Sequence, residues 1–360
     1  ENPSHRQLLV NGAIVDLGGR HLDAVLSVSA NRIVVTAYNK PWELEVFEIS
    51  GDSVTSLSDP HGFAMAIADD EYAIVIQHDL VNELTRYLVK RGNETIHEIA
   101  THAKTPIVAA APKIQQTSGG LATAVLMPEG HTAGSHKLPV VVAIYGGPHH
   151  SEVIASRLSF ADDQWLANQG FAVVIIDNSG TPGHSPEFER RVVNDLSEVV
   201  LADQVSALTE LAALYPDLDL DRVGIHGWSF GGYLSALAVL DRPDVYKAAW
   251  AGAPVTDWRL YDTAYTERYL GDPNQQPEVY AANSLIPRAV KLERPLMLIH
   301  GLADDNVLAA HSLQLSGALL AAGKAHQFLP LAGVSHMTPQ VEITKNLMLL
   351  MRDFFKTHLA

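Results

Sequence analysis

Short segments in which apolar and polar residues alternate fill the first hundred residues of the chain. Examples lie at 32–38, 42–49 and 72–76, each bounded by Gly, Pro, Asn or Asp. Alternation with a period of two is typical of half-buried β-strands, and no segment of this region has a convincing helical pattern. The pattern predicts antiparallel sheet of the kind found in propeller blades. At about 40 residues per blade, there is room for two to three blades.

The rhythm changes after about residue 118, where apolar strands alternate with helices. Leu201, Val205, Leu208 and Ala212 recur at helical spacing, and a long helix is predicted over 340–358. Continuous apolar strands are buried on both faces, so this half is predicted to be a mostly parallel sheet covered by helices. The strands that carry this prediction are 139–145, 171–176 and 295–300.

The two rhythms divide the chain into two predicted domains, an all-β segment over 1–105 and an α/β domain over 106–360. The segment 105–117 contains two prolines and few large apolar residues, so the joint is expected there. A closed propeller needs four to eight blades, so the first domain is expected to be the last blades of a truncated propeller. The chain also lacks an initiator methionine, which suggests a processed form or a fragment.

Composition excludes several classes of function. The 360 residues include 25 basic and 41 acidic side chains, a formal charge of −16, which disfavours nucleic acid and anionic membrane surfaces as partners. No apolar run is long enough to span a membrane. The lack of cysteine excludes disulfides, thiolate catalysis and cysteine-bound zinc without fixing the compartment. We expect a soluble protein, cytoplasmic rather than secreted.

No cofactor or metal is expected. The chain has no phosphate-binding loop of the Walker type and no dinucleotide fingerprint. His97 and His102 flank a segment that resembles a metalloprotease helix, but they are five residues apart. On a helix, that spacing separates two side chains by roughly 140°, which is too far for them to share one ion.

The most informative motif is Gly-Trp-Ser-Phe-Gly-Gly at 227–232. It follows a predicted strand at 221–226 and precedes a predicted helix at 233–240. A G-x-S-x-G turn between strand and helix is a nucleophile elbow, in which the glycines leave room for a sharply bent backbone. The motif therefore predicts Ser229 as a nucleophile.

A serine hydroxyl needs a base to accept its proton, and in such sheets the base follows an acid along the chain. His336 is the preferred base because it lies in a loop between a predicted strand and the final helix. His300 ends an apolar strand and is expected to bond to backbone. The remaining downstream histidines, His311, His326 and His358, are expected to be solvated.

Two adjacent carboxylates, Asp304 and Asp305, follow the strand at 295–300. They lie at the carboxyl edge of the predicted sheet, where α/β proteins assemble their active sites. Chain order and loop position favour Asp304 as the group that orients the imidazole. Asp305, ahead of Val307, is also suited to capping a helix N-terminus.

Three motifs together resemble the dipeptidyl peptidase IV branch of the prolyl oligopeptidase family. They are Gly-Trp-Ser-Phe-Gly-Gly-Tyr at 227–233, Ala-Asp-Asp-Asn-Val at 303–307, and a block over 253–271 that contains Tyr-Thr-Glu-Arg-Tyr. The resemblance covers about 118–360 and implies an α/β-hydrolase fold. It also implies that Asp304, rather than Asp305, is the triad acid and that His336 is the base.

The resemblance assigns further site residues by position. Tyr145, in Tyr-Gly-Gly-Pro at 145–148, matches a family tyrosine that binds the oxyanion together with the backbone N–H after the serine, here that of Phe230. Asn306 matches an asparagine that holds the P2 carbonyl of the substrate. A small apolar S1 pocket is implied for Val255, Trp258, Tyr261, Tyr265 and Val307.

The resemblance implies a serine peptidase that acts on short peptides and releases N-terminal dipeptides with proline or alanine at P1. In this branch a Glu-Glu pair recognises the free amino terminus, and residues 1–105 contain no adjacent glutamates. Either that pair is expected upstream of Glu1, or the protein is an acylaminoacyl peptidase, an oligopeptidase or an esterase instead. A catalytically silent interaction protein is a further alternative. The expected partners are a peptide substrate and, by family expectation, a second copy of the chain.

Overall fold

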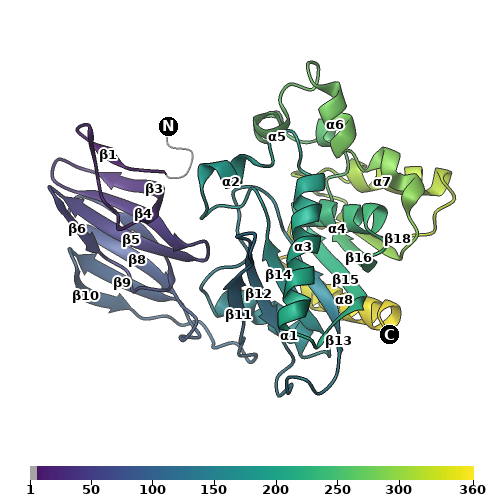
Figure 1. Cartoon of the computed structure of the whole chain (residues 1–360), viewed down its shortest axis with the longest axis horizontal. Helices are drawn as coiled ribbons and strands as arrows, with labels where there is room; N and C mark the ends of the chain where they lie inside the picture. The colour runs from purple at the N-terminus through teal and green to yellow at the C-terminus, as the bar shows by residue number, and fades with distance from the viewer. Residues whose placement is uncertain (1–5) are drawn as a thin grey trace. The chain divides into compact units, whose positions relative to one another are not determined.

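The computed structural model describes residues 6–360 (Figure 1), which form two compact units. Unit 1 contains the chain up to Lys113 together with Val153–Trp165 and Thr181–Arg190. Unit 2 contains Ile114–Glu152, Leu166–Gly180 and Arg191–Ala360. Each unit is built around its own sheet.

Unit 1 consists of two four-stranded antiparallel blades. They are linked in one sheet by a single parallel pair between Leu44 and Phe63, and a small hairpin of β1 (Leu9–Val10) and β2 (Ala13–Ile14) precedes them. The first blade contains β3 (His21–Val28), β4 (Ile33–Lys40), β5 (Glu43–Ser50) and β6 (Ser53–Ser56). The second contains β7 (Phe63–Ala68), β8 (Tyr72–His78), β9 (Arg86–Arg91) and β10 (Glu94–Ile99).

The alternating pattern of the sequence arises in strands that have one face in the core and the other partly exposed. In β8, for example, Ala73 and Val75 are buried while their neighbours are partly exposed. β4 and β5 instead contribute to core clusters on both faces, and β10 is exposed. One cluster joins both blades through Val34, Val46, Leu57, Ala64, Ala73, Val75 and Leu88. The predicted antiparallel blades are confirmed, and residues 6–360 contain two of them. His97 lies in β10 rather than on a helix.

Unit 2 contains an eight-stranded sheet in the order β11-β12-β14-β13-β15-β16-β17-β18. β12 pairs antiparallel with β14, and the pairs from β14 to β18 are parallel. The strands are β11 (Lys113–Gln116), β12 (Ala122–Leu126), β13 (Leu138–Ala143), β14 (Ala172–Asp177), β15 (Leu218–Trp228), β16 (Tyr246–Gly252), β17 (Leu296–Gly301) and β18 (Gln327–Leu331).

Helices cover both faces of this sheet, with α3 and α4 in front and α8 behind in Figure 1. Phe354 of α8 packs on Trp250, and a Cβ at Gly224 would lie 2.6 Å from the Phe355 ring, so this face admits α8 closely. The longer helices are α3 (Glu198–Leu214), α4 (Phe230–Asp241), α5 (Thr263–Leu270), α7 (Ala310–Ala321) and α8 (Val341–His358). Shorter ones in unit 2 are η2 (Trp258–Leu260), α6 (Pro277–Asn283) and η3 (Ile286–Lys291). η1 (Leu158–Phe160), most of α1 (Ala161–Ala167) and α2 (Pro186–Arg190) lie in the segments of unit 1.

This architecture confirms the predicted α/β-hydrolase fold. Because neighbouring parallel strands end at the same edge of a sheet, the loops that follow them meet there. Here the loops after β13, β15, β16, β17 and β18 carry the predicted site residues. In chain order these loops carry Tyr145, Ser229, Val255, Asp304 and His336.

Candidate active site

Ser229 stands in a strained turn between β15 and α4. Its backbone has φ 60° and ψ −114°, a conformation that residues other than glycine rarely adopt. Such a conformation persists only where the surrounding structure enforces it. The surroundings here are tight, since a Cβ at Gly227 or Gly231 would lie 2.2 or 2.0 Å from the carbonyl oxygen of Ile144. The glycines of the motif are therefore required by close backbone packing, as the elbow prediction assumes.

Backbone hydrogen bonds hold the elbow on both sides. The N–H of Ser229 donates to the Gly252 carbonyl of β16 at 2.8 Å, and the Ser229 carbonyl accepts from Tyr233 at 3.0 Å. Phe230 is the first residue of α4. The first N–H groups of a helix have no intrahelical partner and lie at its positive end, so the Phe230 N–H is well suited to an oxyanion.

Asp304 is buried and contacts His336 directly. Its Oδ2 lies 2.8 Å from His336 Nδ1, and its Oδ1 accepts the backbone N–H groups of Asn306 at 3.0 Å and Val307 at 2.9 Å. Asp305 is exposed. Asp304 binds both the turn and the imidazole. The next helix, α7, begins at Ala310 without a side-chain cap, so the capping role considered for Asp305 is not observed there.

The loop of His336 is tied to the elbow through its backbone. Its carbonyl accepts the indole N–H of Trp228, the residue before Ser229, at 2.7 Å. The His336 side chain is 16% exposed. Since Asp304 is an acceptor, Nδ1 of His336 carries the proton, and Nε2 is the nitrogen left for proton transfer. The structure thus brings His336 to Asp304 and joins its loop to the residue beside Ser229.

Tyr145 follows β13 and is half-buried. Its ring lies 6.2 Å from that of Phe230 and 4.8 Å from that of His150, in an edge-on contact. Burial raises the pKa of the Tyr145 phenol, with smaller contributions from Tyr261 and Glu152. The hydroxyl therefore stays protonated at neutral pH and remains a hydrogen-bond donor.

Two of the residues predicted to form the S1 pocket, Tyr261 and Tyr265, pack around a third, Trp258. Its ring is buried and lies 6.2 Å from Tyr265, nearly parallel to it, and 5.9 Å from Tyr261. The Tyr261 hydroxyl donates to Asn306 Oδ1 at 3.2 Å, which joins this cluster to the loop of Asp304. Val255 and Val307 are buried.

Three further aromatic side chains belong to this cluster. Tyr233 and Tyr269 were missed as site residues by the sequence analysis, and Phe230 was predicted only for its backbone N–H. Phe230 and Tyr233 lie 5.4 and 5.3 Å from Trp258, and Tyr269 lies 5.1 Å from Tyr265. The four-residue spacing of Tyr265 and Tyr269 places them on one helix face and was a usable signal. Burial raises the pKa of both Tyr233 and Tyr265.

The remaining downstream histidines differ in their burial and in their hydrogen-bond partners. His300 bonds to backbone, as predicted, through Nε2 and the Val307 carbonyl at 2.7 Å. The prediction that His311 is solvated is wrong, because its side chain is completely buried and its Nδ1 accepts the Thr256 N–H at 3.1 Å. His326 and His358 are partly buried.

Within residues 6–360, no group of three or more His, Asp or Glu side chains is placed to hold a metal ion. The same part of the chain contains no helix that is both long and apolar enough to cross a bilayer. The compartment stays a prediction.

A sequence profile of the prolyl oligopeptidase family, a family of serine peptidases, matches residues 157–360, more than half of the chain. The chain belongs to this family. The matched range contains the elbow, the contact between Asp304 and His336, and the aromatic cluster, so the family resemblance of the sequence motifs is confirmed.

Curated relatives of this prolyl oligopeptidase family member carry dipeptidyl peptidase names. Dipeptidyl peptidase 8 of Mus musculus is 42% identical over 196 residues, which is 53% of this chain and 22% of that protein. Dipeptidyl peptidase family member 2 of Caenorhabditis elegans is 32% identical over 231 residues, which is 62% of this chain and 28% of that protein. The chain thus spans about a quarter of their length.

The fold extends the similarity to the all-β unit. The crystal structure of Porphyromonas gingivalis dipeptidyl peptidase 4 matches 99% of this chain and 53% of that one, with a TM-score of 0.86 and 24% sequence identity. The match supports the same fold along nearly the whole chain. This chain corresponds to about half of that structure.

Proposed function

We propose that this chain carries the catalytic machinery of a serine dipeptidyl peptidase. The observation that carries the proposal is the buried contact between Asp304 and His336, in a loop that Trp228 joins to the strained Ser229 elbow. The dipeptidyl peptidase names of the relatives favour a peptide substrate over the esters hydrolysed by other enzymes of this fold.

In the proposed reaction, the Ser229 hydroxyl attacks the carbonyl carbon of the scissile peptide bond, and Nε2 of His336 takes the hydroxyl proton. Asp304 keeps the imidazole in the Nδ1–H tautomer and stabilises the imidazolium that forms. The imidazolium then gives its proton to the leaving amine, which leaves an acyl group on Ser229. Water, activated by the same nitrogen, releases the acyl group.

The negative oxygen formed by this attack needs donors that are already in place. The Tyr145 hydroxyl and the Phe230 N–H are the proposed donors, one from the loop after β13 and one from the first turn of α4. The raised pKa of Tyr145 supports this role, because a phenol that stays protonated can donate throughout the neutral range. One such donor lowers a barrier by about 3 to 4 kcal/mol.

The P1 side chain is proposed to enter the aromatic cluster around Trp258. Rigid rings offer a flat apolar surface to a small, compact side chain, which suits proline or alanine. Asn306, held by the Tyr261 hydroxyl at 3.2 Å, is proposed to donate its amide N–H to the P2 carbonyl. Dipeptide release with proline or alanine at P1 remains part of the proposal.

Active-site labelling with a fluorophosphonate probe and hydrolysis of an Xaa-Pro chromogenic peptide test this function. We expect the parent chain to be labelled and to turn over the peptide, and we expect Ser229→Ala to lose both. Ser335→Ala is the matched control, since it removes an exposed hydroxyl beside His336 and should be labelled normally.

Comparison of free and N-acylated peptides then assigns the type of peptidase. A preference for the free amino terminus supports dipeptide release, and a preference for the blocked peptide indicates an acylaminoacyl peptidase. Labelling of Ser229→Ala equal to that of the parent would exclude Ser229 as the nucleophile. A folded parent chain that is not labelled at all would favour the interaction protein.

A further inference from the structure

A completely buried histidine, His300, lies behind the proposed catalytic acid. It is the penultimate residue of β17, and its ring contacts three groups. Nδ1 lies 2.7 Å from the Ser312 hydroxyl of α7, and Nε2 lies 2.7 Å from the Val307 carbonyl and 3.5 Å from Oδ2 of Asp304. The proposed reaction assigns no step to this side chain.

The contacts define which nitrogen of His300 carries the proton. A carbonyl accepts hydrogen bonds and never donates, so Nε2 must carry the hydrogen that points to Val307. Burial lowers the pKa of His300, which favours the neutral ring. Nδ1 is then an acceptor, and the Ser312 hydroxyl donates to it. Ser312 thus holds the ring with its N–H facing the loop of Asp304.

The loop that His300 holds contains three site residues. Two side chains hold this turn. Asp304 binds the N–H groups of Asn306 and Val307, and His300 of β17 binds the Val307 carbonyl. A rotation of the His300 ring would release Val307 and withdraw an N–H from the neighbourhood of the carboxylate.

His311, the residue before Ser312, makes similar contacts to the loop that carries Val255 and Trp258. His311 Nδ1 accepts the Thr256 N–H at 3.1 Å, and its carbonyl accepts the Thr256 hydroxyl at 2.8 Å. Thr256 lies between Val255 and Asp257, directly before Trp258. All four side chains involved in these two sets of contacts, His300, His311, Ser312 and Thr256, are completely buried.

We propose that the first turn of α7 positions both halves of the site: Ser312 holds the loop of Asp304 through His300, and His311 holds the loop of Trp258 through Thr256. The inference rests on the proposed function and adds positioning residues to it. Ser312 and His300 act on the rate of the chemical step, because they align the acid. Thr256 and His311 act on substrate binding, because they place the wall of the S1 pocket.

The test uses single hydroxyl deletions in the full chain, with rates expressed per fluorophosphonate-labelled site. Ser312→Ala should lower kcat roughly 10-fold and change KM less than twofold, since small misplacements of a catalytic group cost rate rather than affinity. Thr256→Val keeps the side-chain shape and the backbone N–H bond to His311 Nδ1, and it deletes the hydroxyl bond to the His311 carbonyl. It should raise KM severalfold with little change in kcat.

Ser316→Ala is a matched control one turn further along α7. Ser316 donates to His326 Nε2 at 2.7 Å, and His326 Nδ1 bonds to the Lys324 carbonyl at 3.1 Å, so the same type of bridge is broken away from the site. We expect parental kcat and KM from Ser316→Ala. A general loss of stability on deleting a buried hydroxyl lowers the number of labelled sites and leaves the rate per site unchanged.

A proton NMR signal gives a readout that does not depend on turnover. The His336 Nδ1–H bonded to Asp304 is expected at low field, assigned by its loss in His336→Gln. It should move upfield or broaden in Ser312→Ala and stay unchanged in Ser316→Ala.

Parental kinetics per site and an unchanged low-field signal in Ser312→Ala would overturn the role of Ser312. A KM for Thr256→Val equal to that of the parent would overturn the role of Thr256. An unlabelled parent chain would contradict the proposed function instead, and the NMR comparison would still decide whether Ser312 positions Asp304.

Discussion

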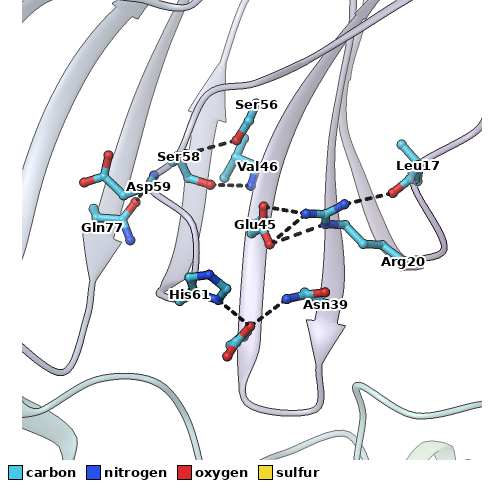
Figure 2. A network of polar contacts seen from close by, with 11 residues as sticks. Leu17, Arg20, Asn39, Glu45, Val46, Ser56, Ser58, Asp59, His61 and Gln77 are labelled. Atoms are coloured by element: carbon cyan, nitrogen blue, oxygen red, sulfur yellow. Dashed lines mark hydrogen bonds and ion pairs between the residues drawn. The ribbon is translucent and has the colours of Figure 1, made fainter.

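Each unit contains a buried carboxylate that contacts a histidine, and the other hydrogen-bond partners of the two carboxylates differ. In unit 1, Glu43 lies 3.3 Å from His61 and also accepts Asn39 and Lys40 at 2.7 and 3.1 Å. In unit 2, Asp304 lies 2.8 Å from His336 and otherwise accepts backbone N–H groups. Figure 2 shows the surrounding contacts in unit 1, where Arg20 also donates to Glu45 through Nε and Nη2 and to the Leu17 carbonyl through Nη1.

The difference lies in whether a permanent cation is present. Burial raises the pKa of Glu43, but hydrogen bonds from Lys40 and Asn39 outweigh it and hold the pKa below its usual value. The charge of that carboxylate is already matched before any histidine is protonated. Among the described residues, Asp304 bonds to His336 and to the N–H groups of Asn306 and Val307 and lies 3.5 Å from His300, with no lysine or arginine among these partners. A proton arriving on His336 therefore supplies the matching charge. A buried carboxylate arranged in the second way is suited to stabilise a transient imidazolium.

The largest expected effect comes from removing the charge of Asp304. Asp304→Asn should lower kcat per labelled site roughly 10³- to 10⁴-fold, because the amide favours the wrong imidazole tautomer and leaves the imidazolium unmatched. Steady-state hydrolysis of an Xaa-Pro chromogenic peptide measures the effect. Asp305→Asn, which changes the exposed neighbour, should stay within about twofold of the parent. Equal losses of kcat in Asp304→Asn and Asp305→Asn would mean that the buried contact with His336 does not identify the catalytic acid.

The sequence alone could place this acid in a loop, and chain order and loop position favoured Asp304, with Asp305 considered for capping a helix. The family resemblance then gave the same choice. The choice depends on which side chain turns inward, a property set by the contacts of the 301–307 turn. The Ser229 elbow was more predictable, because its glycines report a steric requirement that is local to the motif.

His311 shows where sequence reasoning failed although a signal was present. His311, Leu315 and Leu319 are spaced four residues apart and share the buried face of α7. Treating histidine as a polar residue of a helical stretch hid that periodicity. The contacts of Ser312 with His300, in contrast, join a strand and a helix whose packing no local pattern reports. The all-β unit was predictable in type because period-two alternation is local, whereas the number of blades was only bounded by length.

The next largest effect is expected in unit 1, on stability rather than rate. Glu45→Gln removes a carboxylate that is 3% exposed and leaves the Arg20 guanidinium without its partner. Since Arg20 is 25% exposed and partly hydrated, we expect the free energy of unfolding to fall by roughly 2 to 3 kcal/mol. Urea denaturation followed by circular dichroism measures it, and kcat per labelled site should be unchanged.

Glu98→Gln is the control for Glu45→Gln. It breaks an ion pair with Arg86 in which the two side chains are 49% and 34% exposed, and it should cost less than about 0.5 kcal/mol. A loss of catalytic rate per site in Glu45→Gln would show that the unit 1 network affects catalysis. The contrast between the carboxylates of unit 1, expected to affect stability, and Asp304, expected to affect the rate, would then no longer hold.

A smaller effect is expected from the buried His311 on acidification. Burial lowers its pKa from 6.5 to about 4, with a further contribution from His300. Between these two values the unfolded chain binds the proton and the folded chain does not, so stability is lost as the pH falls below 6.5. At pH 5 the loss amounts to about 2 kcal/mol. Urea denaturation at pH 7 and pH 5 measures the free energy of unfolding at each pH. The decrease between the two pH values should be about 2 kcal/mol smaller in His311→Asn than in the parent. The same acid sensitivity in the variant would assign the effect to other groups.

The smallest effect is expected from His61, the histidine of the unit 1 network. Its side chain is 72% exposed, and Lys40 and Asn39 remain on Glu43 when the imidazole is removed. His61→Ala should therefore change the free energy of unfolding by less than about 0.5 kcal/mol at pH 7 and pH 5 alike. Urea denaturation at the two pH values measures it. A larger loss that appears only at pH 5 would show that Glu43 depends on an imidazolium, as proposed for Asp304, and the presence of a lysine would then no longer distinguish the two carboxylates.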